Sequence, residues 1–220
     1  MLVFIHIVNP RHLRLNITSY IRTLIMIQLQ PLPFKPTDLE PYMSAKTIEY
    51  HYNHHHAGYV KTVNKDIAGT SNNKLTLREL MRVDGPPLFV AAVHQVYNHE
   101  QFWSVLTAEQ HHGTASPDIL SNLSTNFGGW QEFKTKVLDE SLSLVGSGWL
   151  WVVLNKGNIE IHLVPNAVST TQYVLFVIDL WEHAYYLDTP ANKKKYIDNI
   201  WNILNWNIIN DRYNYNSRKI

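Results

Sequence analysis

The sequence predicts an α+β fold in which an N-terminal long-helix hairpin is followed by an α/β domain with a three-stranded antiparallel sheet. The first half of the chain contains two long helical patterns, over residues 44–69 and 88–106, and long helices joined by a loop favour an antiparallel hairpin. The second half contains three short runs rich in β-branched and aromatic residues, at 149–154, 159–164 and 173–178. A helical region therefore precedes a small sheet along the chain.

The composition is that of an ordinary globular protein, and it limits the chemistry that the chain can carry. Of 220 residues, 45% are apolar and 17% are charged, and the formal net charge is +1. So small a charge gives no electrostatic basis for binding nucleic acid or an anionic membrane, and we expect neither as a partner. The chain contains 12 histidines and no cysteine. Any metal site must therefore use nitrogen and oxygen ligands.

The first 26 residues differ from the rest in charge. They contain Arg11, Arg14 and Arg22 but no acidic residue, a bias that resembles an organelle-targeting presequence. In a second interpretation, Met26 is the true start of the protein. We expect an intracellular protein, placed in the mitochondrion or another organelle if residues 1–26 are a presequence and in the cytoplasm otherwise.

The N-terminal half begins with an extended segment and then becomes helical. Residues 31–36 contain too many prolines for a helix. Ser44 is a suitable N-cap for the first long helix, which fades near Gly69. A short helix is expected over residues 75–82, before the glycine and prolines at 85–87, and the second long helix follows.

The C-terminal half alternates helices, turns and strands. Helices are expected over residues 117–127 and 130–145, separated by two glycines. The Gly-Ser-Gly sequence at 146–148 ends the helical pattern, and a turn at 155–158 joins the first two strands. After the strands, the pattern predicts helices over residues 181–187 and 192–208, and then an Asn- and Tyr-rich tail.

A polar stretch at 107–116 marks the expected boundary between the two halves. We therefore divide the chain into a targeting leader or non-essential extension (1–26), an N-terminal helical hairpin domain (27–113) and a C-terminal α/β domain (114–220).

The pentapeptide Asp179–His183 places an oxygen ligand and a nitrogen ligand four residues apart, directly after the buried run 173–178. A carboxylate that emerges from a core strand needs a partner, because an unpaired buried charge is costly. A metal ion is one such partner. The other interpretation makes Asp179 the N-cap of a helix that begins at Trp181, with His183 exposed to solvent. These residues alone do not distinguish the two.

The long helices also contain histidines at ligand spacing. His51, His55 and Tyr59 lie four residues apart on one helix face, so a histidine pair could chelate a metal, but the spacing does not say which histidine is the ligand. On the second long helix, His99 lies among aromatic residues that would bury it. Gln95 precedes it by four residues, and its amide could hydrogen-bond a metal-bound water or simply be exposed.

Four blocks of this sequence resemble, in order and spacing, the signature sequences of the iron/manganese superoxide dismutases. The similarity extends over roughly residues 32–206, and the block Asp-Leu-Trp-Glu-His-Ala-Tyr-Tyr makes it specific. The blocks are Thr47–Val60, Gln95–His99, Gly146–Trp151 and Asp179–Tyr186.

The resemblance implies an enzyme that converts superoxide to O₂ and H₂O₂ by ping-pong redox cycling of a single iron in each subunit. Three imidazoles and one carboxylate suit iron or manganese, because both metals accept such ligands and have two accessible redox states. The implied metal ligands are His51, His99, Asp179 and His183. The residues implied for catalysis are Gln95, Tyr59, the gateway histidine His55, and Trp149, which forms an aromatic wall with Trp151.

The resemblance also implies a homodimer. Glu182 would contact His183 across the two-fold axis, and Tyr186 would contact His55 across it. The metal site would then depend on dimerisation.

The position of one glutamine indicates the metal. In this family, iron types supply the outer glutamine from the second helix, whereas manganese types supply it from the sheet region, where iron types have alanine. Gln95 and Ala167 match the iron pattern. The alternatives are a manganese or cambialistic dismutase, and a dismutase-like metal-binding protein without turnover.

The sequence departs from the family pattern at several positions near these blocks. The usual pair of asparagines is replaced in the stretch 89–94, which ends at His94, and Tyr97 stands in place of the usual tryptophan. His54 replaces a basic residue, and Lys193 replaces an arginine, keeping its charge but not its bidentate geometry. None of the four ligands is lost.

Overall fold

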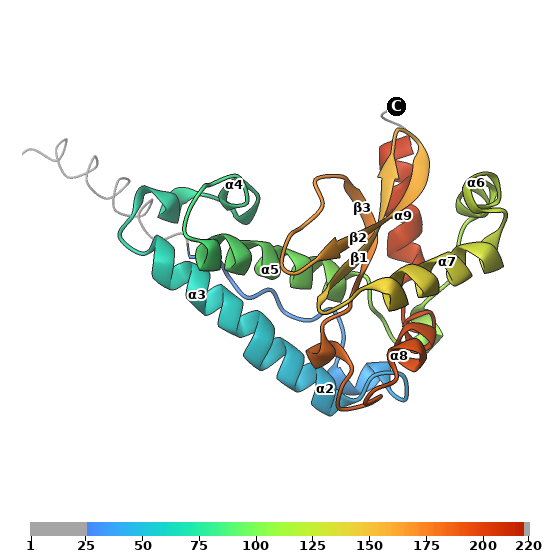
Figure 1. The fold of residues 1–220 in the computed structure, drawn as a ribbon, viewed down its shortest axis with the longest axis horizontal. Helices are drawn as coiled ribbons and strands as arrows, with labels where there is room; N and C mark the ends of the chain where they lie inside the picture. The colour runs from blue at the N-terminus through green and yellow to red at the C-terminus, as the bar shows by residue number, and fades with distance from the viewer. Residues whose placement is uncertain (1–25, 218–220) are drawn as a thin grey trace, which may run out of the picture.

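The computed structural model describes residues 26–217, which form a helical hairpin beside a domain built around a small sheet (Figure 1). The expected leader over residues 1–26 lies outside the described residues, except for Met26. Within the described part of the chain, no helix combines the length and the apolar character needed to cross a membrane.

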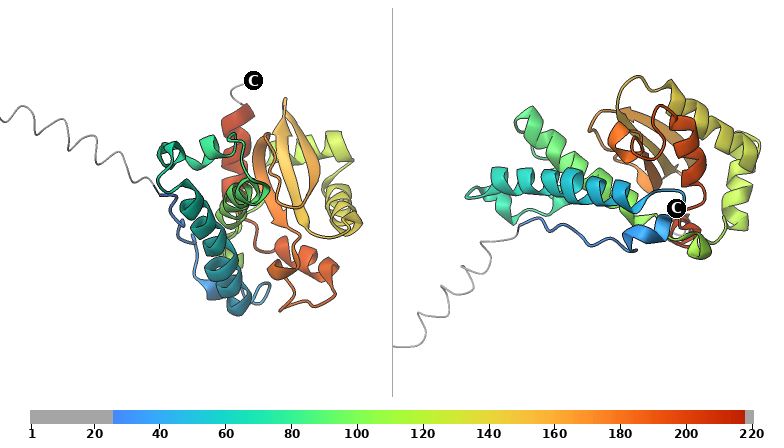
Figure 2. Two further views of the ribbon diagram at one scale, coloured as in Figure 1. Left: turned by 60° about the vertical axis from the view of Figure 1, so that its left-hand side comes forward. Right: turned by 90° about the horizontal axis from the view of Figure 1, so that it is seen from below.

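The predicted N-terminal hairpin is confirmed. Its first arm consists of α2 (Ala45–Tyr50), the π-helical segment η2 (His51–His56) and α3 (Ala57–Ile67), and its second arm is α5 (Pro87–Ser104). Figure 2 shows α5 between α3 and the sheet, and α5 contacts both α3 and β3. The apolar side chains buried in the hairpin include Val60, Val63, Ile67, Val93 and Val96.

The first arm is not the uniform α-helix that the sequence pattern predicts, because a π-helical turn interrupts it. The wider turn leaves His51 and His56 buried, His54 exposed and His55 partly exposed. His51 and His55 remain neighbours, with ring centroids 6.2 Å apart, and His56 is buried as well. π-Helical turns inside α-helices often occur at functional sites.

Side-chain caps define where two helices of this region begin. The Ser44 hydroxyl accepts a hydrogen bond from the Thr47 N–H at 3.1 Å, as expected for the N-cap of α2. Thr76 and Glu79 form a capping box at the start of α4 (Leu77–Leu80), which is shorter than the helix predicted over residues 75–82. The described residues also form short 3₁₀ helices: η1 (Pro36–Leu39), η3 (Ser71–Lys74) and η4 (Glu109–His111).

The C-terminal half contains the predicted three-stranded antiparallel sheet. Its strands are β1 (Gly148–Asn155), β2 (Asn158–Pro165) and β3 (Tyr173–Asp179), in the order β2-β1-β3. In the register of β1 with β3, Trp149 pairs with Asp179. This register places the last residue of β3 beside the first tryptophan of β1.

Helices α6 (Pro117–Phe127) and α7 (Trp130–Ser143) pack against this sheet, and α6 has the predicted bounds. Gly128 separates them with φ of 93°, a conformation that glycine adopts without strain. The core between the helices and the sheet is rich in aromatic side chains. They include Phe133, Trp149, Trp151, Phe176 and Trp201.

The helix predicted over residues 181–187 is wrong. The chain forms only a three-residue 3₁₀ helix, η5 (Glu182–Ala184), followed by turns. The Trp181 N–H donates a hydrogen bond to Asp179 Oδ1 at 2.9 Å, and His183 folds back towards the same carboxylate. These contacts favour a tight turn over a regular helix.

The single helix predicted over residues 192–208 is also wrong, because the chain forms two helices. They are α8 (Lys193–Ile200) and α9 (Trp206–Ser217), and α9 takes the place of the expected tail. The break contains Ile203, whose carbonyl accepts a hydrogen bond from the Thr107 N–H at 2.8 Å. This long-range contact uses a backbone group that a continuous helix would need.

We expect Gly148→Ala to destabilise the protein by about 2 kcal/mol, as over-packing typically does. A Cβ on Gly148 would lie 2.5 Å from the Val164 carbonyl oxygen, and this oxygen belongs to the backbone of the neighbouring strand. Gly58→Ala is the matched control, because its Cβ would meet no atom within 4 Å and it lies in a helix, where alanine is favoured by about 1 kcal/mol. Urea unfolding measures the free energy of unfolding of both variants. Equal stability of the two variants would contradict this account.

Candidate metal centre

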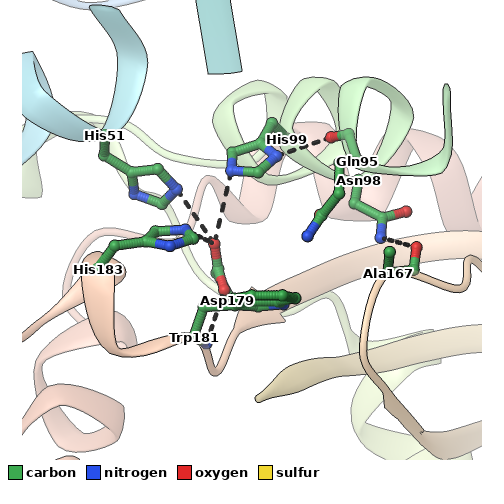
Figure 3. Close-up of polar contacts among 8 residues, drawn as sticks. All are labelled: His51, Gln95, Asn98, His99, Ala167, Asp179, Trp181 and His183. Carbon is green, nitrogen blue, oxygen red and sulfur yellow. Dashed lines mark hydrogen bonds and ion pairs between the residues drawn. The ribbon is translucent and has the colours of Figure 1, made fainter. Parts of the chain in front are cut away.

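Four side chains from four separate elements meet beside the end of β3 (Figure 3). Their ligand atoms all lie within 4.8 Å of one another. They are His51 of η2, His99 of α5, Asp179 of β3 and His183 of η5. The structure thus brings together the four residues that the resemblance implies as ligands.

The three imidazoles face the same carboxylate oxygen. The distances from Asp179 Oδ2 are 3.1 Å to His51 Nε2, 3.3 Å to His183 Nε2 and 3.8 Å to His99 Nε2. Three of these four side chains are fully buried, and that of His183 is 12% exposed. One oxygen therefore faces three nitrogen atoms in a site that is nearly closed to solvent.

The other oxygen of Asp179 holds the backbone. Oδ1 accepts the hydrogen bond from the Trp181 N–H, so the carboxylate organises the turn and also faces the imidazoles. The alternative interpretation, in which Asp179 caps a helix that begins at Trp181 and His183 is exposed to solvent, is wrong, because no such helix forms and the His183 side chain is only 12% exposed. The turn directs His183 back to the carboxylate from four residues further along the chain.

The orientation of His99 comes from its own helix. The His99 ring nitrogen Nδ1 lies 2.7 Å from the backbone carbonyl oxygen of Gln95. Because that carbonyl can only accept, Nδ1 carries the proton and donates. Nε2 is then left with a lone pair that faces the cluster, as a metal-binding imidazole requires.

Burial determines the protonation of the cluster. Burial lowers the pKa of His51 to about 4, although the hydrogen bond with Asp179 opposes the shift. Burial also lowers the pKa of His99 well below its ordinary value. For Asp179, burial alone would raise the pKa, but His183 and His51 lower it below its ordinary value. Near neutral pH these groups are therefore neutral imidazoles and an ionised carboxylate, the forms that bind metals.

The polar atoms of the cluster fit a bound cation. The ring nitrogens of His51 and Nε2 of His99 are buried, and beyond the Asp179 carboxylate they have no polar partner among the described residues. Buried polar atoms without partners are costly, and a cation among them would satisfy several at once. Three nitrogen donors and one carboxylate are a suitable ligand set for iron or manganese.

Most of the other predicted site residues border this cluster. Tyr59 and Trp149 lie against His99, with ring centroids 5.6 and 5.0 Å away. His55 stacks on His183 at 4.0 Å. Gln95 is 1% exposed and its amide has no hydrogen-bond partner among the described residues. Trp151 lies one layer further out, against Trp149 at 6.4 Å.

Sequence reasoning missed His56. Its side chain is 1% exposed and stacks on His99, with ring centroids 5.3 Å apart. Burial lowers the pKa of His56 to about 3, so it supports the ligand as a neutral ring. The signal was the run of three histidines at 54–56, but only the π-helical turn shows which of them points inward.

Two positions that depart from the family pattern lie on the side of α5 that faces the β2–β3 loop. His94 Nδ1 lies 2.8 Å from the Ser169 hydroxyl, and Asn98 donates a hydrogen bond to the Ala167 carbonyl at 3.0 Å. Tyr97 packs against Trp151 and beneath the guanidinium group of Arg78. These contacts hold the loop that carries Ala167, and sequence reasoning did not foresee them.

Family models match both halves of the chain. The model described as "Iron/manganese superoxide dismutases, alpha-hairpin domain" matches residues 26–107, and "Iron/manganese superoxide dismutases, C-terminal domain" matches residues 115–212. Together they include all four residues of the metal cluster.

Several curated relatives are similar over nearly their whole length. A "Superoxide dismutase [Fe]" of Entamoeba histolytica is 34% identical over 188 residues, which are 84% of this chain and 98% of the relative. Proteins of the same name from Coxiella burnetii and Escherichia coli K12 are 36% and 34% identical over 186 residues, 83% of this chain and 95% of each relative. The chain belongs to the iron/manganese superoxide dismutase family.

Proposed function

We propose that this protein is an iron superoxide dismutase with one metal ion in each subunit. The observation that supports it most is the convergence of three imidazoles and one carboxylate in a buried site. When bound there, iron would supply one-electron redox chemistry, by which one superoxide is oxidised to O₂ and the next is reduced to H₂O₂. The iron-type names of the relatives agree with this proposal.

We assign the binding of the metal to the four clustered side chains, His51, His99, Asp179 and His183. The Gln95 carbonyl and the Trp181 N–H orient two of these ligands, so the site is organised before a metal arrives. Burial keeps bulk water away from the cluster and restricts access to small molecules.

Tyr59 and Gln95 would manage protons beside the metal. Reduction of superoxide to H₂O₂ consumes two protons, so the site needs hydrogen-bond donors that keep their protons at neutral pH. Burial raises the pKa of Tyr59, with a further contribution from Asp179 and an opposing one from the nearby Gln95 side chain. The Tyr59 hydroxyl therefore stays protonated and can donate to a small oxygen anion. The Gln95 amide is buried and has no hydrogen bond of regular geometry with the described residues, so it can donate from the second helix.

Gln95 also supports iron over manganese. In the family pattern the glutamine lies on the second helix in iron types, and this chain has Gln95 there and Ala167 on the β2–β3 loop. Asn98 holds the Ala167 carbonyl at 3.0 Å, which fixes the loop beside α5 (Figure 3). A manganese or cambialistic enzyme, and a metal-binding protein without turnover, are the alternatives that experiment must separate.

We expect superoxide consumption after reconstitution with iron, and little after reconstitution with manganese. Elemental analysis measures the bound metal, and a superoxide-consumption assay measures the activity with each metal.

The His51→Gln variant should lose most of its bound metal and its activity, because the substitution removes a fully buried ligand. His54→Gln is the matched control, because His54 is exposed on the same helical segment, and it should keep both. Activity with manganese alone would contradict the iron assignment, and a metal-loaded protein inactive with either metal would overturn the enzymatic function.

We expect Gln95→Ala to keep a near-normal iron content and to lose activity by about 10- to 100-fold, the usual effect of removing an outer hydrogen bond of a metal site. Gln101→Ala, on the same helix but partly exposed, is the control and should match the unmodified enzyme. Iron analysis and the superoxide assay should be run on the same samples. Unchanged activity of Gln95→Ala would remove Gln95 from the mechanism.

We also propose that the protein is a homodimer formed around the metal sites. Glu182 is exposed and makes no ion pair with a described residue of its own chain. Two large hydrophobic side chains follow it: Tyr186 is 54% exposed and Leu187 is 52% exposed. His55 is partly exposed and stacks on the ligand His183. These residues lie next to the metal cluster and are suited to cover it in an assembly.

We expect Glu182→Ala to shift the protein from dimer towards monomer and to weaken metal retention at the same time, because Glu182 directly precedes the ligand His183. Light scattering and iron analysis over a dilution series measure the two effects. Glu132→Ala, which removes an exposed carboxylate on α7, should leave the dimer intact. An unaltered dimer in the Glu182 variant would count against the proposed interface.

A further inference from the structure

A cavity that the metal site does not use lies between α4, α5 and the β2–β3 loop. Figure 1 shows α4 and this loop on the same side of α5. The cavity has a volume of about 150 Å³. Its lining consists of Arg78, Met81, Arg82, His94, Tyr97 and residues 169–172.

A second cavity of about 220 Å³ adjoins the first and shares Arg78, Tyr97 and Gln172 with it. Its remaining lining includes Arg212, together with neutral side chains. Both volumes lie below those of pockets for drug-sized ligands, which are about 300–1,000 Å³. The two cavities therefore suit a small ligand.

The charge that lines the two cavities is one-sided, although Glu100 acts on Arg78 and Glu79 acts on Arg82 from outside the lining. Three arginines and one histidine line the two cavities, and no carboxylate does. Three other hollows in the described part of the chain differ, because the lining of each includes at least one acidic residue. In a chain whose net charge is only +1, this is a local concentration of positive charge.

Arg78 of α4 and Arg82, two residues beyond its end, are exposed and form no close ion pair with a described residue. Neither Arg78 nor Arg82 has a carboxylate within 4.0 Å among the described residues. Arg78 lies over the ring of Tyr97 at 5.5 Å, which holds its guanidinium group at the cavity wall. Arg212 differs, because it donates to the Leu175 carbonyl and the Ser104 hydroxyl and so supports the fold.

The loop side of the cavity supplies neutral hydrogen-bonding groups, of which Ser169 and Thr170 are buried and Thr171 and Gln172 are exposed. The Ser169 backbone N–H donates to His94 Nδ1 at 3.3 Å, so Nδ1 accepts and the proton of the neutral ring is on Nε2. His94 can therefore meet a ligand with an N–H donor. Thr170 and Thr171 add hydroxyl groups, and Gln172 adds an amide, along the same wall.

The cavity coincides with positions at which this chain departs from the family pattern. Tyr97 stands where a tryptophan is usual, and its ring lines the cavity between α5 and the loop. His94 ends the stretch in which the usual pair of asparagines is replaced. The basic lining and the space thus occur together in this sequence.

We propose that the first of these cavities, hereafter the α4–α5 cleft, binds a small oxyanion of the phosphate type. The oxyanion is either free phosphate or the phosphate group of a small metabolite. Arg78 and Arg82 would pair with the phosphate oxygens, because a guanidinium group presents paired N–H donors that match them. The hydroxyl, amide and imidazole groups of the β2–β3 loop and α5 would complete its hydrogen bonds.

Isothermal titration calorimetry of the purified, metal-loaded protein tests the proposal, with inorganic phosphate, sulfate and glycerol phosphate as probes at constant ionic strength. We expect saturable binding with one site per chain. Tighter binding of glycerol phosphate than of inorganic phosphate identifies a phosphorylated metabolite as the ligand class, and the reverse identifies free phosphate. Absence of saturable binding for all three probes would overturn the proposal.

Arg78→Gln and Arg82→Gln should each weaken binding about tenfold, the effect of losing one charge-assisted hydrogen-bonding partner. Lys74→Gln is the matched control, because it removes one exposed positive charge close to α4 without lining the cleft. An equal loss of affinity in the Lys74 control would mean general electrostatic attraction and would contradict a defined site.

Tyr97→Trp should fill the cleft and abolish binding, and unchanged binding by a folded Tyr97→Trp variant would overturn the location. Because binding is read directly, these results do not depend on whether the enzyme proposal holds.

Discussion

The structure depends on a single buried oxygen, Oδ2 of Asp179, and the three imidazole nitrogens that face it. Burying a carboxylate is costly unless it is paired, and neutral imidazoles repay only part of that cost. The cluster is therefore most favourable when a cation lies among its members. Each element that carries a ligand comes from a different part of the chain, so formation of the site and folding of the two halves are linked.

The sheet and the hairpin serve this cluster in different ways. The register of β1 with β3 places Asp179 at the end of a rigid strand, opposite Trp149. The hairpin provides His51 and His99 on two packed helices. Aromatic rings fill the space around the ligands and restrict their movement, with His56 stacked on His99 from behind. Such packing holds ligands in position better than loops alone would.

Helix α5 contributes side chains to both the metal cluster and the α4–α5 cleft, because successive residues of a helix point in different directions. His99 and Gln95 face the metal cluster, whereas His94 and Tyr97 line the α4–α5 cleft. The β2–β3 loop is shared in the same way, since Asn98 holds Ala167 and His94 contacts Ser169. The metal centre and the cleft are thus neighbours across one helix and one loop.

The sequence by itself determined the fold class, the strands, the two arms of the hairpin and the four side chains that meet in the cluster, because periodicity and block spacing are local properties that survive in any context. Only the tertiary structure showed the π-helical turn at His51–His56, which side-chain spacing does not reveal. It also replaced the helix predicted from Trp181 with a tight turn and broke the last predicted helix near Ile203, where carboxylate or long-range hydrogen bonds replace helical ones. The burial of His56 and the basic α4–α5 cleft likewise depend on groups distant in sequence, and no local pattern records their meeting.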